Sequence, residues 1–166
     1  MRNWTVRIVV LAALIGVGLL SWRFFFPSPE QAIRKRLGEL ARMASFSTSE
    51  SGPAKLWNAE KLSSFCTTDV EMNIDIPGRS RQTFSGRQEV LQTAVGARSM
   101  VSSLQIEFLD VTIAVNPDKV SAVVNLTGRG KIPGEKDFLV QELKFTLKKM
   151  EGDWLINRIE TVKTLY

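Results

Sequence analysis

Histidine is absent from the 166 residues, and cysteine and tyrosine occur once each, as Cys66 and Tyr166. Without histidine the chain has no Ser–His–Asp triad, no histidine general base and no histidine metal ligand. A single cysteine excludes an internal disulfide and any zinc site built from cysteines. The commonest routes to catalysis near neutral pH are therefore missing, and we expect neither a metal nor another cofactor.

Positive charge is also scarcer than the net charge of +5 suggests. Three of the 22 lysines and arginines, but none of the 17 acidic residues, lie in residues 1–26, which leaves 19 basic against 17 acidic residues, or +2, in the other 140. No basic run with interleaved aromatic residues appears, and no glycine-rich loop marks a phosphate site. The composition therefore argues against nucleic acid as a partner.

One long apolar segment is present at the N-terminus. Arg2 and Arg7 precede the run from Ile8 to Trp22, and after Arg23 the run continues through three phenylalanines to Phe26. As a helix, residues 8–26 measure about 28 Å, which can cross a hydrocarbon core of about 30 Å. We expect residues 1–26 to be a single-pass membrane anchor with a short cytoplasmic head, and residues 27–166 to form one domain.

The same segment has the basic start and apolar centre of a removable secretory signal. Only Gly16 and Gly18 offer small residues for cleavage, and a cut there would leave tryptophan and three phenylalanines in water, so a retained anchor is favoured. The short basic head favours a cytoplasmic N-terminus and an exported domain, although arginines on both sides of the span weaken this inference.

Three helices are expected after the anchor. Ser28 and Gln31 form a capping box, and apolar residues then recur at helical spacing from Ile33 to Ala44. The stripe of Leu56, Ala59, Leu62 and Phe65 predicts a short second helix, in which Trp57 is read as a core residue. A second capping-box pattern over residues 85–88 opens a third helix.

The strands follow from alternation of apolar and polar residues. They are expected over residues 70–76, 80–84, 104–115, 120–126, 139–147 and 154–162, with turns at 116–118 and 150–153 and a loop at 128–134. The alternation changes phase near Asp110, which predicts a bulge that bends the strand. This order predicts an α+β fold: a transmembrane helix, then a cone of three helices packed on a curved, mainly antiparallel sheet.

Three stretches resemble the nuclear transport factor 2-like superfamily, the cystatin-like cone that includes SnoaL-like polyketide cyclases and ketosteroid isomerases. They are Leu62–Phe65 leading into the strand at Val70, the segment Gly86–Val90, and the terminal hairpin Leu147–Ile156. The likeness covers residues 29–163. It implies a cone whose wide end can hold a cavity, and it also implies dimers through the open sheet face, so a homodimer is possible.

The resemblance does not by itself choose a function. Its isomerases use an aspartate together with a tyrosine and a protonated aspartate, but the only tyrosine here is the last residue. Membrane-anchored relatives look different in role: assembly factors of type IV secretion systems and accessory proteins of some lipid-import systems resemble this arrangement of a short cytoplasmic head, one span and an exported cone. We therefore expect a non-enzymatic scaffold or a module for a small apolar ligand in an envelope complex. The alternative is a histidine-free isomerase or cyclase acting on a hydrophobic carbonyl compound.

Two groups of residues are candidate sites. Asp110, aimed by the bulge, could line an open cone with Asn125, Gln141 and Asn157, and it is the only candidate base; alternatively, it faces solvent and only marks the phase change. The second candidate is a basic patch for lipid headgroups or an acidic partner, and it consists of Arg79, Arg81 and Arg87. Alternatively, these arginines only keep the domain soluble. Cys66 is expected to be buried packing.

Overall fold

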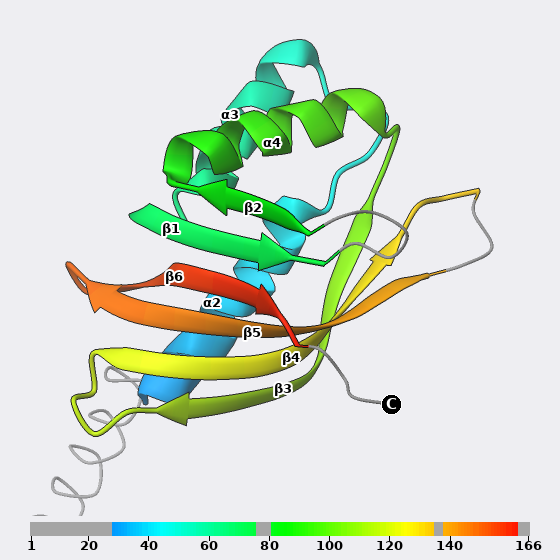
Figure 1. Ribbon diagram of the computed structural model, residues 1–166. Helices are drawn as coiled ribbons and strands as arrows, with labels where there is room; N and C mark the ends of the chain where they lie inside the picture. Colours follow the sequence, from blue (N-terminus) through cyan, green and yellow to red (C-terminus); the bar gives the residue numbers. More distant parts are fainter. Residues whose placement is uncertain (1–27, 76–80, 135–137, 163–166) are drawn as a thin grey trace, which may run out of the picture.

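Three helices and six strands make up the part of the chain that this computed structural model describes, residues 28–75, 81–134 and 138–162 (Figure 1). The helices are α2 (Pro29–Ala44), α3 (Gly52–Ser63) and α4 (Arg87–Met100). The strands are β1 (Cys66–Ile74), β2 (Gln82–Ser85), β3 (Gln105–Val115), β4 (Ser121–Lys131), β5 (Leu139–Met150) and β6 (Asp153–Thr161). The expected α+β fold with three helices is confirmed.

The strands form one curved sheet in the order β2-β1-β6-β5-β4-β3. The β1–β6 pair is parallel and the other pairs are antiparallel, so the sheet is mixed. β1 begins at Cys66, earlier than the alternation indicated, because Cys66 pairs with Ile156 of β6. The backbone N–H of Ile156 donates to the carbonyl of Phe65 at 2.8 Å.

The expected loop at residues 128–134 is wrong in its first half, since β4 continues to Lys131. Gly128 and Gly130 lie opposite Gln141 and Leu139 of β5. A Cβ added at Gly128 would come within 3.0 Å of Leu143 Cδ1. The glycines therefore mark close packing inside a strand, a use of glycine that composition alone does not distinguish from a loop.

Helix α2 packs across the inner face of the sheet, which we define as the face that it covers. Ser28 Oγ accepts from the N–H of Gln31 at 3.3 Å, and Gln31 Oε1 accepts from the N–H of Ser28 at 3.4 Å, so the expected capping box is present. The helix buries Ile33, Leu37 and Leu40, as its apolar stripe predicts.

The bulge in β3 is also present. The register with β4 shifts between Leu109 and Thr112, and Asp110 has a φ of 51°. Phe108 before the bulge and Val111 after it both pack against the core, so the parity of inward-facing residues changes as predicted. The bulge keeps apolar side chains on the inner face on both sides of the bend.

A buried ion pair fastens the helices together. Arg98 of α4 is 2% exposed, and its Nη1 donates to both carboxylate oxygens of Glu50 at 2.8 and 2.7 Å. Its Nη2 donates to the carbonyl of Met43 at the end of α2, and its guanidinium lies 4.9 Å from the ring centre of Phe46. Arg98 thus joins α4 to α2 and to the loop before α3.

The expected membrane anchor, residues 1–26, lies outside the described residues. Within residues 28–75, 81–134 and 138–162, no helix has the length and apolar character needed to span a bilayer.

Candidate functional site

The space between α2 and the sheet is filled by apolar side chains. Phe145 and Leu147 of β5 are 2% and 1% exposed, and Trp154 of β6 is 3% exposed. The rings of Phe145 and Phe108 meet edge to face, with centres 5.8 Å apart. Interiors packed in this way hold few voids larger than a water molecule. The described part of the cone is therefore a core rather than a ligand chamber.

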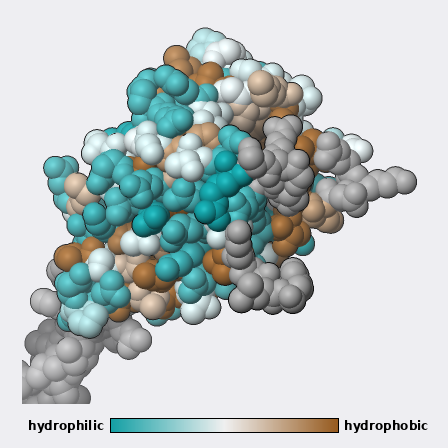
Figure 2. Space-filling model, in the orientation of Figure 1, coloured by the Kyte–Doolittle hydropathy of each residue, from teal (hydrophilic) through white to brown (hydrophobic). Residues whose placement is uncertain are grey.

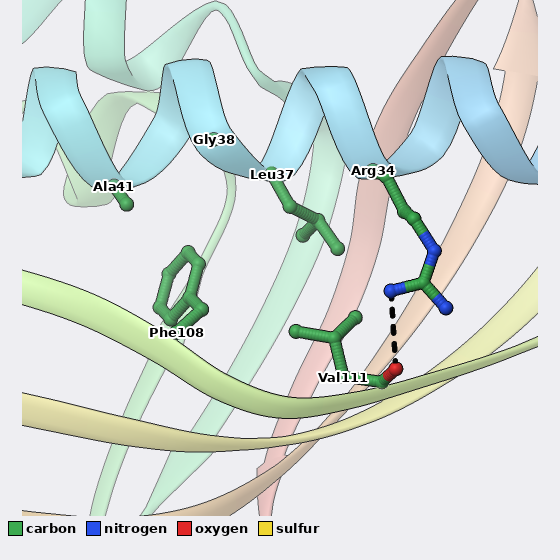
Figure 3. A pocket seen from close by; sticks show the side chains of 6 residues that line it. All are labelled: Arg34, Leu37, Gly38, Ala41, Phe108 and Val111. Carbon is green, nitrogen blue, oxygen red and sulfur yellow. Dashed lines mark hydrogen bonds between the residues drawn. The ribbon is translucent and has the colours of Figure 1, made fainter.

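A shallow groove of about 210 Å³ remains between α2 and β3 (Figure 3). Ser45 at the end of α2 accepts from the N–H of Ile106 at 2.9 Å, and Arg34 Nη1 donates to the carbonyl of Val111 at 3.3 Å. Between these two bridges the groove is lined by Arg34, Leu37, Gly38, Ala41, Phe108 and Val111. A Cβ at Gly38 would meet no atom within 4 Å, so the groove is open on that side.

The chemistry available in this groove is limited. Its one ionisable lining residue is Arg34, whose Nη2 also donates to Glu30 at 3.1 Å. A guanidinium stays protonated in proteins and serves neither as a base nor as a nucleophile. The groove can hold one large apolar side chain or a small apolar ligand, with a cation at one end.

Asp110 and Asn125 lie away from this groove, and both are exposed. Asp110 Oδ2 accepts from Thr127 Oγ1 at 3.4 Å. Thr127 and Asn125 alternate with the buried Leu126 on β4, so they lie on the outer face of the sheet. Asp110 and Asn125 therefore lie on the solvent-facing side of the sheet. For Asp110 this agrees with the alternative that it faces solvent and only marks the phase change.

Gln141 and Asn157 are held by other partners. Gln141 Nε2 donates to the backbone carbonyl of Asp75, and Asn157 Nδ2 donates to Thr67 Oγ1 at 3.3 Å. The first bond joins β5 to the residue that follows β1, and the second joins β6 to β1. The four predicted ligand-binding side chains do not come together at one site, because they belong to opposite faces and different strands.

Two of the three arginines of the predicted basic patch are bonded within the domain, and Arg79 lies outside the described residues. Arg81 binds Asp75 through Nε and Nη2 at 2.8 and 3.1 Å, and this partner raises the pKa of its guanidinium. Arg87 donates from Nε and Nη2 to the carbonyl of Cys66 at 3.0 and 2.5 Å. These bonds give Arg81 and Arg87 structural roles.

Cys66 is 3% exposed, in agreement with its expected packing role. Burial raises the pKa of its thiol from 9.0 to about 11, and the charge of Arg87 offsets only part of this rise. Because the pKa of the thiol is higher in the folded state, the folded protein keeps this proton between pH 9.0 and about 11, where the unfolded chain loses it. The free energy of unfolding should therefore be unaffected below pH 9 and fall above it, by about 1.4 kcal/mol per pH unit.

Urea titrations of the full chain between pH 8 and 11 would measure how the free energy of unfolding falls with pH. A Cys66→Ala variant is the control, because it lacks the contribution of the thiol to this slope. At pH 8 the folded protein should also react with a thiol reagent only as it unfolds. Rapid labelling of the folded protein, or the same slope in both proteins, would contradict this account.

Two neighbouring large apolar residues of α3, Leu56 and Trp57, are exposed, and we call them the α3 surface. These side chains are 50% and 59% exposed, whereas the helix buries the small residues Ala59 and Ser63. The expectation that Trp57 belongs to the core is therefore wrong. Lys61 Nζ lies 4.9 Å from the centre of the Trp57 ring, one helical turn away. In the sequence, a lysine four positions after an aromatic residue was the signal that this side of the helix faces solvent.

The outer face of the sheet has the opposite character. Figure 2 shows hydrophilic side chains spread over it. Arg158 lies 3.7 Å from Glu71 and 3.2 Å from Glu160, and these charged residues cross β1 and β6. A dimer formed through this face would have a polar interface. The homodimer stays a prediction.

Comparisons with known proteins identify the fold. No family model matches the chain, and no curated protein does. A scytalone dehydratase-like protein of Novosphingobium aromaticivorans aligns with a TM-score of 0.63 and 16% identity over 82% of this chain and 84% of its own. A nuclear transport factor 2-like protein of the same organism gives 0.62 and 17% identity, with 86% of each chain covered.

A chain from the complex of the yeast deubiquitinase Ubp3 with its cofactor Bre5 gives a TM-score of 0.57 and 12% identity, over 82% of this chain and 98% of its own. Identities this low establish the fold and leave the activity open. This chain therefore has the cystatin-like fold of the nuclear transport factor 2-like proteins.

Proposed function

We propose that this protein is a membrane-tethered, non-enzymatic scaffold that holds a partner protein within an envelope-associated complex. Its N-terminus is cytoplasmic, its apolar segment crosses the membrane once, and its cone domain is exported. The observation that carries the proposal is the filled interior, in which the large side chains of Phe145, Leu147 and Trp154 are almost wholly buried. Within the described residues, the groove beside it offers a cation but no acid–base pair.

The α3 surface is the proposed contact with the partner. Helix α3 exposes a tryptophan and a leucine while it buries an alanine and a serine, so its large apolar side chains are free to contact a partner. Tryptophan is also enriched among the residues that dominate binding energy at protein interfaces. A membrane tether raises the local concentration of such a surface near membrane-bound partners without any catalytic group.

A second candidate function is a module that binds a small apolar ligand, and the groove between α2 and β3 favours it. At about 210 Å³ the groove is smaller than the pockets of about 300–1,000 Å³ that usually hold drug-sized ligands. Its size and openness suit a single side chain of a partner better than an enclosed ligand. The scaffold is therefore the preferred proposal.

The test uses the full chain, isolated gently from its native membrane with whatever partner accompanies it, followed by titration of that partner. Trp57→Ala should weaken binding by about 2 kcal/mol or more, or roughly thirtyfold, as expected for a buried interface tryptophan. Gln92→Ala, an exposed change on α4, is the matched control and should leave binding unchanged. Equal affinities for Trp57→Ala and wild type would refute the α3 contact.

Asp110→Asn separates the scaffold from the enzyme considered above. A scaffold keeps its partner when this exposed carboxylate becomes an amide. An enzyme with Asp110 as its base would instead lose turnover of its carbonyl substrate. Catalysis that disappears in this variant would replace the scaffold proposal with the enzymatic one.

A further inference from the structure

One end of the domain gathers the start of α2 and two hairpin turns. Arg34 of α2 bonds to Val111 of β3, and Ser45, which follows the last residue of α2, bonds to Ile106, so the helix runs opposite to the strand. The start of α2, which Ser28 caps, therefore lies at the end of the sheet where β3 turns into β4; Figure 1 shows this end of the helix beside the β3–β4 hairpin. The chain enters the domain at this end, directly after the expected anchor.

The second hairpin turn lies beside the first. The backbone N–H of Lys149, at the end of β5, donates to the carbonyl of Val120 in the β3–β4 turn at 2.7 Å. Met150 follows Lys149 at the tip of the β5–β6 hairpin. The two tips thus form one continuous rim, which we call the anchor-side rim, consisting of Lys119, Val120, Lys148, Lys149 and Met150.

The anchor-side rim carries apolar residues where turns usually carry polar ones. Val120 is 51% exposed and Met150 is 48% exposed, although turn positions favour Gly, Asn, Asp, Ser and Pro. Each apolar residue directly follows a lysine, and lysine can place its stem among lipid headgroups while its ammonium stays in water. Neither Val120 nor Met150 belongs to the buried core.

Charge alone does not explain this rim. The two turns carry three lysines and three acidic residues, so their net charge is zero. One of these acids, Asp118, is directed into its own turn, where it accepts from the N–H groups of Val120 and Ser121 at 2.9 Å. The apolar tips, rather than electrostatic attraction, would therefore make the contact, and a short tether supplies an effective concentration of about millimolar.

We propose that the anchor-side rim rests on the membrane surface, with Val120 and Met150 inserted at the level of the lipid headgroups. This inference rests on the proposed membrane tether. It fixes the orientation of the domain, because Arg98, in the last turn of α4, bonds both to Met43 at the far end of α2 and to Glu50, which precedes α3. With α2 about 24 Å long, the α3 surface then faces away from the bilayer toward other exported proteins.

The experiment places an environment-sensitive fluorophore on single introduced cysteines of the full chain in phosphatidylcholine–phosphatidylglycerol vesicles. Cys66 stays in place because it is buried. Val120→Cys is the test position, and Leu56→Cys is the control, since the two residues are equally exposed at 51% and 50%. We expect blue-shifted emission and loss of more than half of the intensity with brominated lipids at position 120, and neither at position 56.

Met150→Cys repeats the test independently and should respond like Val120→Cys. The membrane contact alone is overturned if positions 120 and 56 respond equally. It is also overturned if the protein floats with the vesicles but neither rim position responds. A response that depends on protein density but not on brominated lipid would assign the rim to a second copy and overturn it as well. A full chain that does not float with vesicles overturns both the tether and the contact.

Discussion

Replacing Arg98 with methionine should destabilise the domain by about 3–5 kcal/mol. The guanidinium is 2% exposed and binds both oxygens of a carboxylate, Glu50, that is itself only 16% exposed. Without its partner that carboxylate stays largely buried and uncompensated, and the carbonyl of Met43 loses its donor. Urea unfolding of the full chain in nanodiscs, followed by tryptophan fluorescence, would measure the loss.

Arg34→Met is the matched control for this change. Its ion pair with Glu30 joins two side chains that are each about half exposed, so its removal should cost less than about 1 kcal/mol. The double variant Arg98→Met with Glu50→Leu should recover part of the lost stability, because no unpaired charge remains. An Arg98→Met protein as stable as Arg34→Met would show that the buried pair does not fasten the helices.

Phe145→Ala should cost about 3–5 kcal/mol, since it empties the middle of the filled cone. Phe145 is 2% exposed and lies edge to face against Phe108, so the loss combines burial, a residual cavity and an aromatic contact. The same urea measurement checks this value.

Phe138→Ala serves as the control of identical chemistry, because Phe138 is 46% exposed. It contacts the cations of Arg129 and Lys131 at 5.1 Å, so only about 1 kcal/mol is expected from its removal. Similar losses at positions 145 and 138 would mean that the interior is not packed as described.

Features set by neighbouring residues could be predicted from the sequence. The capping box at Ser28, the buried stripe of α2, the phase change at Asp110 and the turn before Asp153 all follow from local spacing, and the structure contains each of them. The parallel pairing of β1 with β6 could not be predicted in this way. It joins Cys66 to Ile156, which are 90 positions apart, and no local pattern encodes such a pairing.

The candidate site was less predictable for the same reason. Asp110, Asn125, Gln141 and Asn157 are polar residues within strands, and their faces depend on register and bulges rather than on residue type. A second bulge, in β6 between the partners of Thr146 and Leu147, changes the parity at Asn157. Trp57 was misassigned because a tryptophan in a helix is usually buried, whereas here small residues take the packing positions.

The two proposed surfaces lie at opposite ends of α2. The anchor-side rim is near Ser28, where the chain enters the domain, and the α3 surface is near the other end of the helix, where Arg98 binds Met43. A domain built in this way would carry a partner at a fixed distance from the bilayer. Its rigidity depends on the packed interior, which is why the packing of Phe145 is central to the account.

Xenon binding followed by methyl NMR of the full chain in nanodiscs tests this packing most directly, because apolar cavities take up xenon and packed cores do not. In the wild-type protein we expect no xenon-dependent shifts for the core methyl groups of Val124, Leu126 and Leu147. The Phe145→Ala variant should show such shifts and serves as the positive control. Saturable shifts at these methyl groups in the wild type would reveal an open chamber and contradict the scaffold proposal.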